Sequence, residues 1–290
     1  MGPQVIDRRT LIATGLAATL LPTWAGADIP SAPPVPRTVK LPVSPTRATD
    51  MTVWEPTGTD RTTGVALLST GHGSWPERYA ALAGVLALCG YVTLAPMHVD
   101  SVRYPERAKF SMQASFGERI ADMAAASAYA AKAYPGLPVI AVGHSFGTLT
   151  ALCRAGALGY LGNFRDPTVK AVLGFSSPGR VPGLVQPTAY AGVTVPLMLI
   201  TGTADVVPGF VTDPADHLLP VETVKGPAYG LVIKGADHEF VGRNDPGIWS
   251  QRPLVGDFAA AHALGDAAAR TRLARWKPAA GDRYIVRNAA

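Results

Sequence analysis

Cysteine is nearly absent from this sequence: only Cys89 and Cys153 occur among its 290 residues. Neither belongs to a Cys-x-x-Cys pair or to a Cys/His spacing of the kind that holds zinc, so the sequence gives no signal for a zinc site or for thiol catalysis. Cys89 ends one predicted helix and Cys153 lies within a later one, and we expect these helices to cover opposite faces of a sheet. Two buried free thiols are therefore predicted rather than a disulfide.

Charged residues are also scarce, at 16% of the chain, and the formal net charge of +5 is scattered along it. No basic cluster is interleaved with aromatic residues, so nucleic acid is not expected as a partner. A helix that spans a bilayer needs about 20 apolar residues, whereas the run from Leu11 to Leu21 has eleven. Stable membrane insertion is therefore not expected either.

The N-terminal segment has the order of a targeting signal. Arg8 and Arg9 precede the apolar run, and small residues follow it at 25–27. We expect residues 1–27 to be a cleavable signal peptide of the twin-arginine type, which predicts a periplasmic or secreted protein. Residues 28–46 are Pro-rich and lack periodicity, so an extended lead-in is predicted there, followed by a single domain over residues 47–290.

Within that domain, short β-branched runs alternate with segments of helical periodicity. This pattern predicts an α/β fold with a mostly parallel central sheet and helices on both faces. The expected strands lie near Met51–Glu55, Gly64–Ser69, Tyr91–Ala95, Val139–Val142, Val169–Phe175, Pro196–Ile200 and Ala228–Ile233, and the expected helices over Arg78–Leu88, Phe116–Tyr134, Phe146–Ala157 and Leu254 to about Trp276. The loops 97–115 and 176–193 are too short for a large cap domain and are expected to form pocket walls.

One predicted strand leads directly into a candidate nucleophile. The apolar residues 138–142 run into Gly143-His144-Ser145-Phe146-Gly147, and helix-forming residues follow. This is the strand–turn–helix context of a G-x-S-x-G nucleophile elbow, which predicts Ser145 as the nucleophile. The turn is sharp and closely packed, so we expect Gly143 and Gly147 to be needed because a side chain there would clash.

A serine nucleophile needs a general base, which follows it in the chain order of this motif. His217, His238 and His262 all follow Ser145. His238 comes directly after a predicted strand, whereas His217 precedes that strand and His262 lies in the predicted last helix. We therefore predict His238 as the base.

The base in turn needs an acid that orients it. Asp205 stands at the carboxyl end of the strand that begins at Pro196, and residues 167–204 contain no Asp or Glu at all. Asp205 is the predicted acid, with Asp213 and Asp216 as the alternatives.

An oxyanion hole requires two backbone N–H groups. The first is expected from Phe146, the residue after the nucleophile, and the second from the loop 71–74. Position in that loop favours the Ser74 N–H, with Gly73 as the alternative. His72 precedes the nucleophile, so we expect it to brace the loop rather than to catalyse.

The motifs of this sequence, taken together, resemble those of one family. The sequence is similar to dienelactone-hydrolase-like α/β-hydrolases related to platelet-activating-factor acetylhydrolase, in the segments Thr70–Ser74, Gly143–Gly147, Asp166–Val172, Ile200–Asp205 and Ile233–His238. The resemblance covers about residues 47–240. It implies an α/β-hydrolase catalytic domain with Ser145, Asp205 and His238 as the triad, an oxyanion hole at Ser74 and Phe146, and neither cofactor nor metal. Small dienelactone hydrolases use a cysteine where this chain has Ser145, so the resemblance does not carry specificity with it.

The leading hypothesis is a serine esterase that cleaves a small-molecule or polymeric carboxylic ester through an acyl-enzyme. A polyester hydrolase, or an amidase or peptidase, would use the same triad, and an exported binding protein could retain the fold without chemistry. Trp75, Met97 and Trp249 are candidates for the substrate pocket, although each could equally be a packing residue. The sequence does not specify the oligomeric state.

Overall fold

The computed structural model describes residues 33–56, 62–243 and 246–288, so the predicted signal peptide lies outside the described residues. Within these ranges the sheet has nine strands in the order β1-β2-β4-β3-β5-β6-β7-β8-β9. The strands are β1 (Arg37–Ser44), β2 (Arg47–Trp54), β3 (Gly64–Ser69), β4 (Tyr91–Pro96), β5 (Val139–His144), β6 (Val169–Phe175), β7 (Leu197–Ala204), β8 (Ala228–Asp237) and β9 (Arg283–Arg287).

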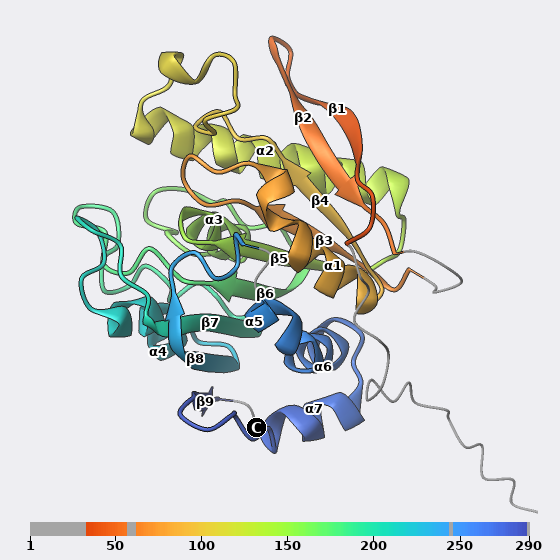
Figure 1. The fold of residues 1–290 in the computed structure, drawn as a ribbon. Helices are drawn as coiled ribbons and strands as arrows, with labels where there is room; N and C mark the ends of the chain where they lie inside the picture. The colour runs from red at the N-terminus through yellow and green to blue at the C-terminus, as the bar shows by residue number, and fades with distance from the viewer. Residues whose placement is uncertain (1–32, 57–61, 244–245, 289–290) are drawn as a thin grey trace, which may run out of the picture.

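The helices lie between these strands and after β8, as Figure 1 shows. They are α1 (Ala80–Leu88), α2 (Met112–Ala133), α3 (Phe146–Arg154), α4 (Leu219–Thr223), α5 (Pro246–Ser250), α6 (Arg252–Ala263) and α7 (Ala267–Ala274), with short 3-10 helices η1 (Pro76–Tyr79), η2 (Arg107–Lys109) and η3 (Pro214–Leu218). No helix in the described ranges has both the length and the apolar content needed to cross a membrane.

The centre of the sheet is parallel and its edges are antiparallel. Strands β4, β3, β5, β6, β7 and β8 pair in parallel, whereas β1–β2, β2–β4 and β8–β9 are antiparallel pairs. The predicted mostly parallel sheet is therefore confirmed. Because the central strands run in one direction, their carboxyl ends share one edge of the sheet, and the loops that leave β3, β5, β7 and β8 meet there.

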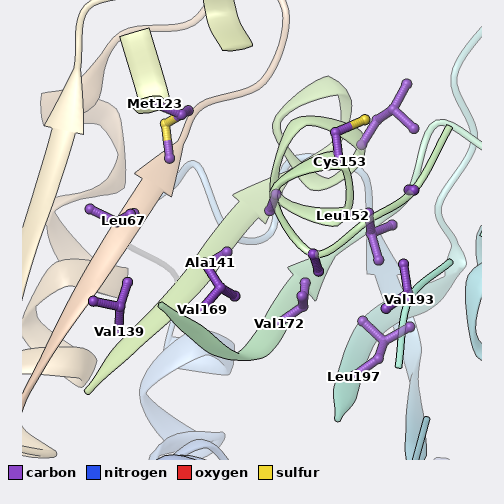
Figure 2. Packing of buried hydrophobic residues seen from close by; sticks show 14 of the residues in the cluster. Leu67, Met123, Val139, Ala141, Leu152, Cys153, Val169, Val172, Val193 and Leu197 are labelled. Carbon is purple, nitrogen blue, oxygen red and sulfur yellow. The ribbon is translucent and has the colours of Figure 1, made fainter. Parts of the chain in front are cut away.

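Two apolar layers sandwich the sheet. One contains the buried faces of α2, α3 and α4, and Figure 2 shows its packing around Leu67, Met123, Val139 and Leu197. The other contains α1, α6 and α7. Strand residues alternate between the layers because successive side chains point to opposite faces. Cys153 lies in the first layer and Cys89 in the second, both as buried free thiols, which agrees with the prediction that the sheet separates them.

The structure differs from the sequence prediction at both ends of the domain. Part of the predicted lead-in forms β1, because Val39, Leu41 and Val43 alternate with polar residues and Leu41 packs into the core despite the nearby prolines. β9 was not predicted at all. The last predicted helix is instead two helices, α6 and α7, because Gly265 between them has φ +75°, a conformation that ends a helix.

Candidate active site

Ser145 stands on a strained turn between β5 and α3. Its backbone has φ 55° and ψ −121°, which is unfavourable for a residue with a side chain. The turn is held because the Ser145 N–H donates to the carbonyl oxygens of Phe175 (2.9 Å) and Ser176 (3.1 Å) at the end of β6. A Cβ on Gly147 would lie 1.9 Å from Ser69 O, and one on Gly143 would lie 2.2 Å from Gly147 O. The expected need for glycine on both sides of Ser145 is thus confirmed by the packing.

Asp205 and His238 form a direct pair at the ends of β7 and β8. The register pairs Ala204 with Asp237, and this brings Nδ1 of His238 to 2.7 Å from Oδ1 of Asp205. Oδ2 of the fully buried Asp205 accepts hydrogen bonds from Ser176 Oγ (2.5 Å) and Thr201 Oγ1 (2.6 Å).

Burial alone would favour the neutral form of Asp205. Hydrogen bonds from the imidazole rings of His217 and His238 outweigh it, and together with the Ser176 hydroxyl they hold the pKa of Asp205 well below its usual range. The site therefore contains an ionised carboxylate that fixes the ring of His238.

His144, the residue before the candidate nucleophile, connects the loop of His238 to the loop 71–74. Its Nε2 lies 2.9 Å from His238 O, its Nδ1 lies 2.8 Å from the Tyr79 hydroxyl, and that hydroxyl accepts from the Gly71 N–H at 3.0 Å. Burial, together with the charge of His238, lowers the pKa of His144 to about 3. A neutral ring with its proton on Nε2 satisfies every partner, since Nδ1 then accepts from Tyr79.

These contacts bring the three predicted triad residues to one end of the sheet. Ser145 is half-buried and directly follows His144, whose ring centroid lies 4.8 Å from that of His238. Among the described residues no hydrogen bond joins the Ser145 hydroxyl to His238. Such contacts are often looser without a substrate and tighten when one binds.

Three of the alternatives to Asp205 and His238 lie in structural positions. Asp213 accepts from the Ala215 N–H at the start of η3, and Asp216 pairs with Arg180 at 3.1 Å. His262 lies in α6 with Nε2 3.1 Å from the Tyr229 hydroxyl.

Three of the four N–H groups in the loop 71–74 already have protein acceptors. Gly71 donates to Tyr79, Gly73 donates to Asp100 Oδ2 at 3.1 Å, and Ser74 donates to Gly71 O at 3.1 Å. The Ser74 N–H chosen from the sequence therefore closes a turn, and the alternative at Gly73 is occupied as well. Neither faces an open position as the loop stands.

The remaining N–H of this loop is that of His72, which has no acceptor among the described residues. The same is true of the Phe146 N–H at the first turn of α3, and the two side chains touch edge to face with ring centroids 6.2 Å apart. The His72 ring itself pairs with Asp100 at 2.9 Å, so it braces the loop as expected. The N–H groups of His72 and Phe146 are thus unused donors, one in the loop after β3 and one in the residue that follows Ser145.

A buried ion pair, which the sequence analysis missed, supports this loop. The guanidinium of Arg119 is fully buried, binds both carboxylate oxygens of Asp100 (2.9 and 2.8 Å), and donates to Thr70 O (2.6 Å) and Gly71 O (3.0 Å). It also lies 4.7 Å from the ring centroid of Phe146. No local signal reveals this role, because a charged residue in a helical pattern normally points to solvent.

A second Ser–His–Asp set lies beneath the loop. Ser69 Oγ is 2.9 Å from Nε2 of His98, and Nδ1 of His98 is 2.8 Å from Oδ2 of Asp122. All three side chains are buried. A buried set of this kind has no access to substrate, so it connects β3, the loop after β4 and α2 rather than acting on a ligand.

The predicted pocket residues have different surroundings. The guanidinium groups of Arg103 and Arg78 lie 4.1 and 5.7 Å from the ring centroid of the half-buried Trp75. The half-buried Met97 is fixed to β2 through its backbone. Trp249 packs on α1, where a Cβ on Gly84 would meet its ring at 2.4 Å, and this favours a packing role for Trp249.

Within the part of the chain that the structure describes, the group closest to a metal-site arrangement is Asp205, His217 and His238, with ligand atoms within 4.8 Å of one another. Both imidazoles, however, point at one oxygen, Oδ1 of Asp205, at hydrogen-bond distance. The three groups are therefore bonded to each other and do not converge on a common open position.

Comparison with solved structures shows the fold. The chain is similar to the esterase domain of a Rhodothermus marinus protein, with a TM-score of 0.58 and 16% identity, over 79% of this chain and 99% of that domain. A scan with protein-family models finds no match, and no curated protein matches either. Together with the strand order and the turn at Ser145, the likeness shows that this protein has the α/β-hydrolase fold.

Proposed function

We propose that the protein is a serine hydrolase that cleaves carboxylic esters through an acyl-enzyme. The observation that carries the proposal is the 2.7 Å contact between the buried Asp205 carboxylate and His238, at the sheet edge where Ser145 occupies a nucleophile elbow. Ser145 Oγ attacks the ester carbonyl, and its proton passes to Nε2 of His238 and then to the leaving alcohol. A water molecule, deprotonated by the same ring, releases the acid.

We further propose that the N–H groups of His72 and Phe146 form the oxyanion hole, in place of the Ser74 N–H favoured by the sequence. Both are unused donors, and the loop of His72 is anchored by Asp100 and Arg119. Preorganised donors of this kind stabilise the charge that develops on the ester oxygen without first giving up another bond.

The proposed branch of the fold, the location of the protein and its substrate class combine the sequence with the fold. The segments quoted above favour the dienelactone-hydrolase-like branch related to platelet-activating-factor acetylhydrolase, and the arginine pair at 8–9 favours export to the periplasm or the medium. The esterase domain with the same fold supports ester hydrolysis as the reaction class. We propose a small-molecule or polymeric ester as the substrate, with no cofactor.

The test is to label the purified protein with a fluorophosphonate, locate the adduct by mass spectrometry, and measure p-nitrophenyl acetate turnover. We expect an adduct on Ser145, no adduct on the buried Ser69 despite its Ser–His–Asp setting, and background turnover in Ser145→Ala with an unchanged circular dichroism spectrum. Unchanged turnover in Ser145→Ala, or labelling of another serine, would refute the assignment.

A further inference from the structure

The acid of the candidate triad binds two histidines through one oxygen atom. Nε2 of His217, in η3, lies 2.8 Å from Oδ1 of Asp205, and Nδ1 of His238 lies 2.7 Å from the same atom. The two rings stack with centroids 5.8 Å apart and an interplanar angle of 23°. His217 and Asp205 are both fully buried, so this contact is shielded from solvent.

The surroundings of His217 determine its protonation state. Its Nδ1 is hydrogen-bonded to Ser177 O, and its Nε2 lies 3.0 Å from Asp205 O as well as 2.8 Å from the carboxylate. Carbonyl and carboxylate oxygens only accept hydrogen bonds, whereas a neutral imidazole has a single N–H. A neutral ring would therefore set a lone pair against an acceptor at one nitrogen, and both nitrogens must carry protons to satisfy the site.

The charges around His217 agree with a cation. Burial opposes ionisation, but the hydrogen bond to Asp205 and the charge of that carboxylate outweigh it and raise the pKa of His217 above its ordinary value. Nearby carboxylates on the packed elements point elsewhere: Asp216 pairs with Arg180, and Glu222 on α4 is exposed. The titratable groups that face the ring of His217 are thus Asp205 and His238.

We propose that His217 is a positioning residue, a buried imidazolium that shares Oδ1 of Asp205 with His238 and so reduces the stabilisation that Asp205 gives to the protonated form of His238. The proposal rests on the proposed function. The protons of His217 do not move during the reaction; its charge offsets that of Asp205. His238 therefore remains unprotonated, and able to act as a base, at a lower pH than it would beside Asp205 alone.

The pH dependence of kcat/KM tests this role. In His217→Gln the carboxylate has one cationic partner fewer, so the acid limb of the profile should move up by about one pH unit, equivalent to a roughly tenfold lower kcat/KM on that limb. The matched control is His262→Gln, which removes a histidine that does not contact Asp205 and should leave the acid limb in place. An unchanged limb in His217→Gln would overturn the proposal.

A second measurement requires neither the His217→Gln variant nor an assay of turnover. Nitrogen-15 NMR of the histidine-labelled full chain at pH 8 should show one imidazole with both ring nitrogens protonated, in wild type and in Ser145→Ala alike. Neutral rings at every histidine would refute the charge on His217 even if Ser145 reacts with a fluorophosphonate. Failure of Ser145 to react, with the imidazolium present, would instead count against the proposed function.

Discussion

Replacing Asp100 with asparagine should cost the protein a large share of its stability. The carboxylate accepts from Arg119 at 2.9 and 2.8 Å, from the Gly73 N–H at 3.1 Å and from His72 Nδ1 at 2.9 Å. The amide of asparagine supplies one oxygen, so its NH₂ group must face a donor, and the charge of the fully buried Arg119 is left without compensation. Breaking a buried pair in this way costs about 3–5 kcal/mol, out of a typical total of about 5–15 kcal/mol.

A double-mutant cycle separates the pair from its neighbours. Arg119→Met should also destabilise, since it leaves Asp100 without its cation and removes the donors to Thr70 O and Gly71 O. The double variant carries neither unpaired charge, so its loss should fall short of the sum of the single losses by about 2 kcal/mol or more.

Urea unfolding at pH 7, followed by circular dichroism, gives the free energies of unfolding. Asp50→Asn is the matched control, because Asp50 makes an ion pair of similar length with Lys40 (2.8 Å) on the exposed surface. Such a pair is worth about 0–1 kcal/mol. A loss in Asp100→Asn no larger than in this control, or single losses that simply add, would refute the reasoning.

Two further predictions concern the elbow and the response to acid. Gly147→Ala should lower the free energy of unfolding by about 1–3 kcal/mol and abolish fluorophosphonate labelling, since its Cβ would meet Ser69 O at 1.9 Å, whereas Gly159→Ala, with no atom within 4 Å, should label normally. Burial disfavours the ionised form of Asp166, but hydrogen bonds from Ser127, Thr168 and Arg154 hold its pKa below the usual value. The contribution of Asp166 to stability is therefore complete above its pKa in the unfolded chain, which is about 4. It is lost as the pH falls through the lower pKa that Asp166 has in the folded protein. In Asp166→Asn the decline of Tm below pH 4 should be shallower, and an equally steep decline would contradict this.

The central fold could be predicted because its signals are local. β3 and β6 have the predicted bounds, since each is a short apolar run closed by glycine or polar residues. β1 and β9 could not be predicted in this way: they are amphipathic edge strands, and β1 carries a proline that argues against a strand when the sequence is considered alone.

The candidate active site could likewise be predicted only in part. The positions of Ser145, Asp205 and His238 follow from motifs that end strands, and the structure brings these residues to one edge of the sheet. The choice between the N–H groups of His72 and Ser74 depends on which of them the folded protein already uses. The Ser74 N–H is used by Gly71 O within the loop, and the Gly73 N–H by Asp100, which is distant in sequence.

The two edge strands also bear on how molecules behave toward one another. An exposed strand edge offers unpaired backbone groups to any other strand, and proteins commonly protect such edges with charged side chains and proline. β1 has exposed Arg37, Lys40 and Pro42, and β9 at the opposite end of the sheet has exposed Arg283. Basic side chains are thus exposed on both edge strands of the sheet. Their charge disfavours the edge-to-edge pairing through which concentrated or newly folded chains begin to aggregate.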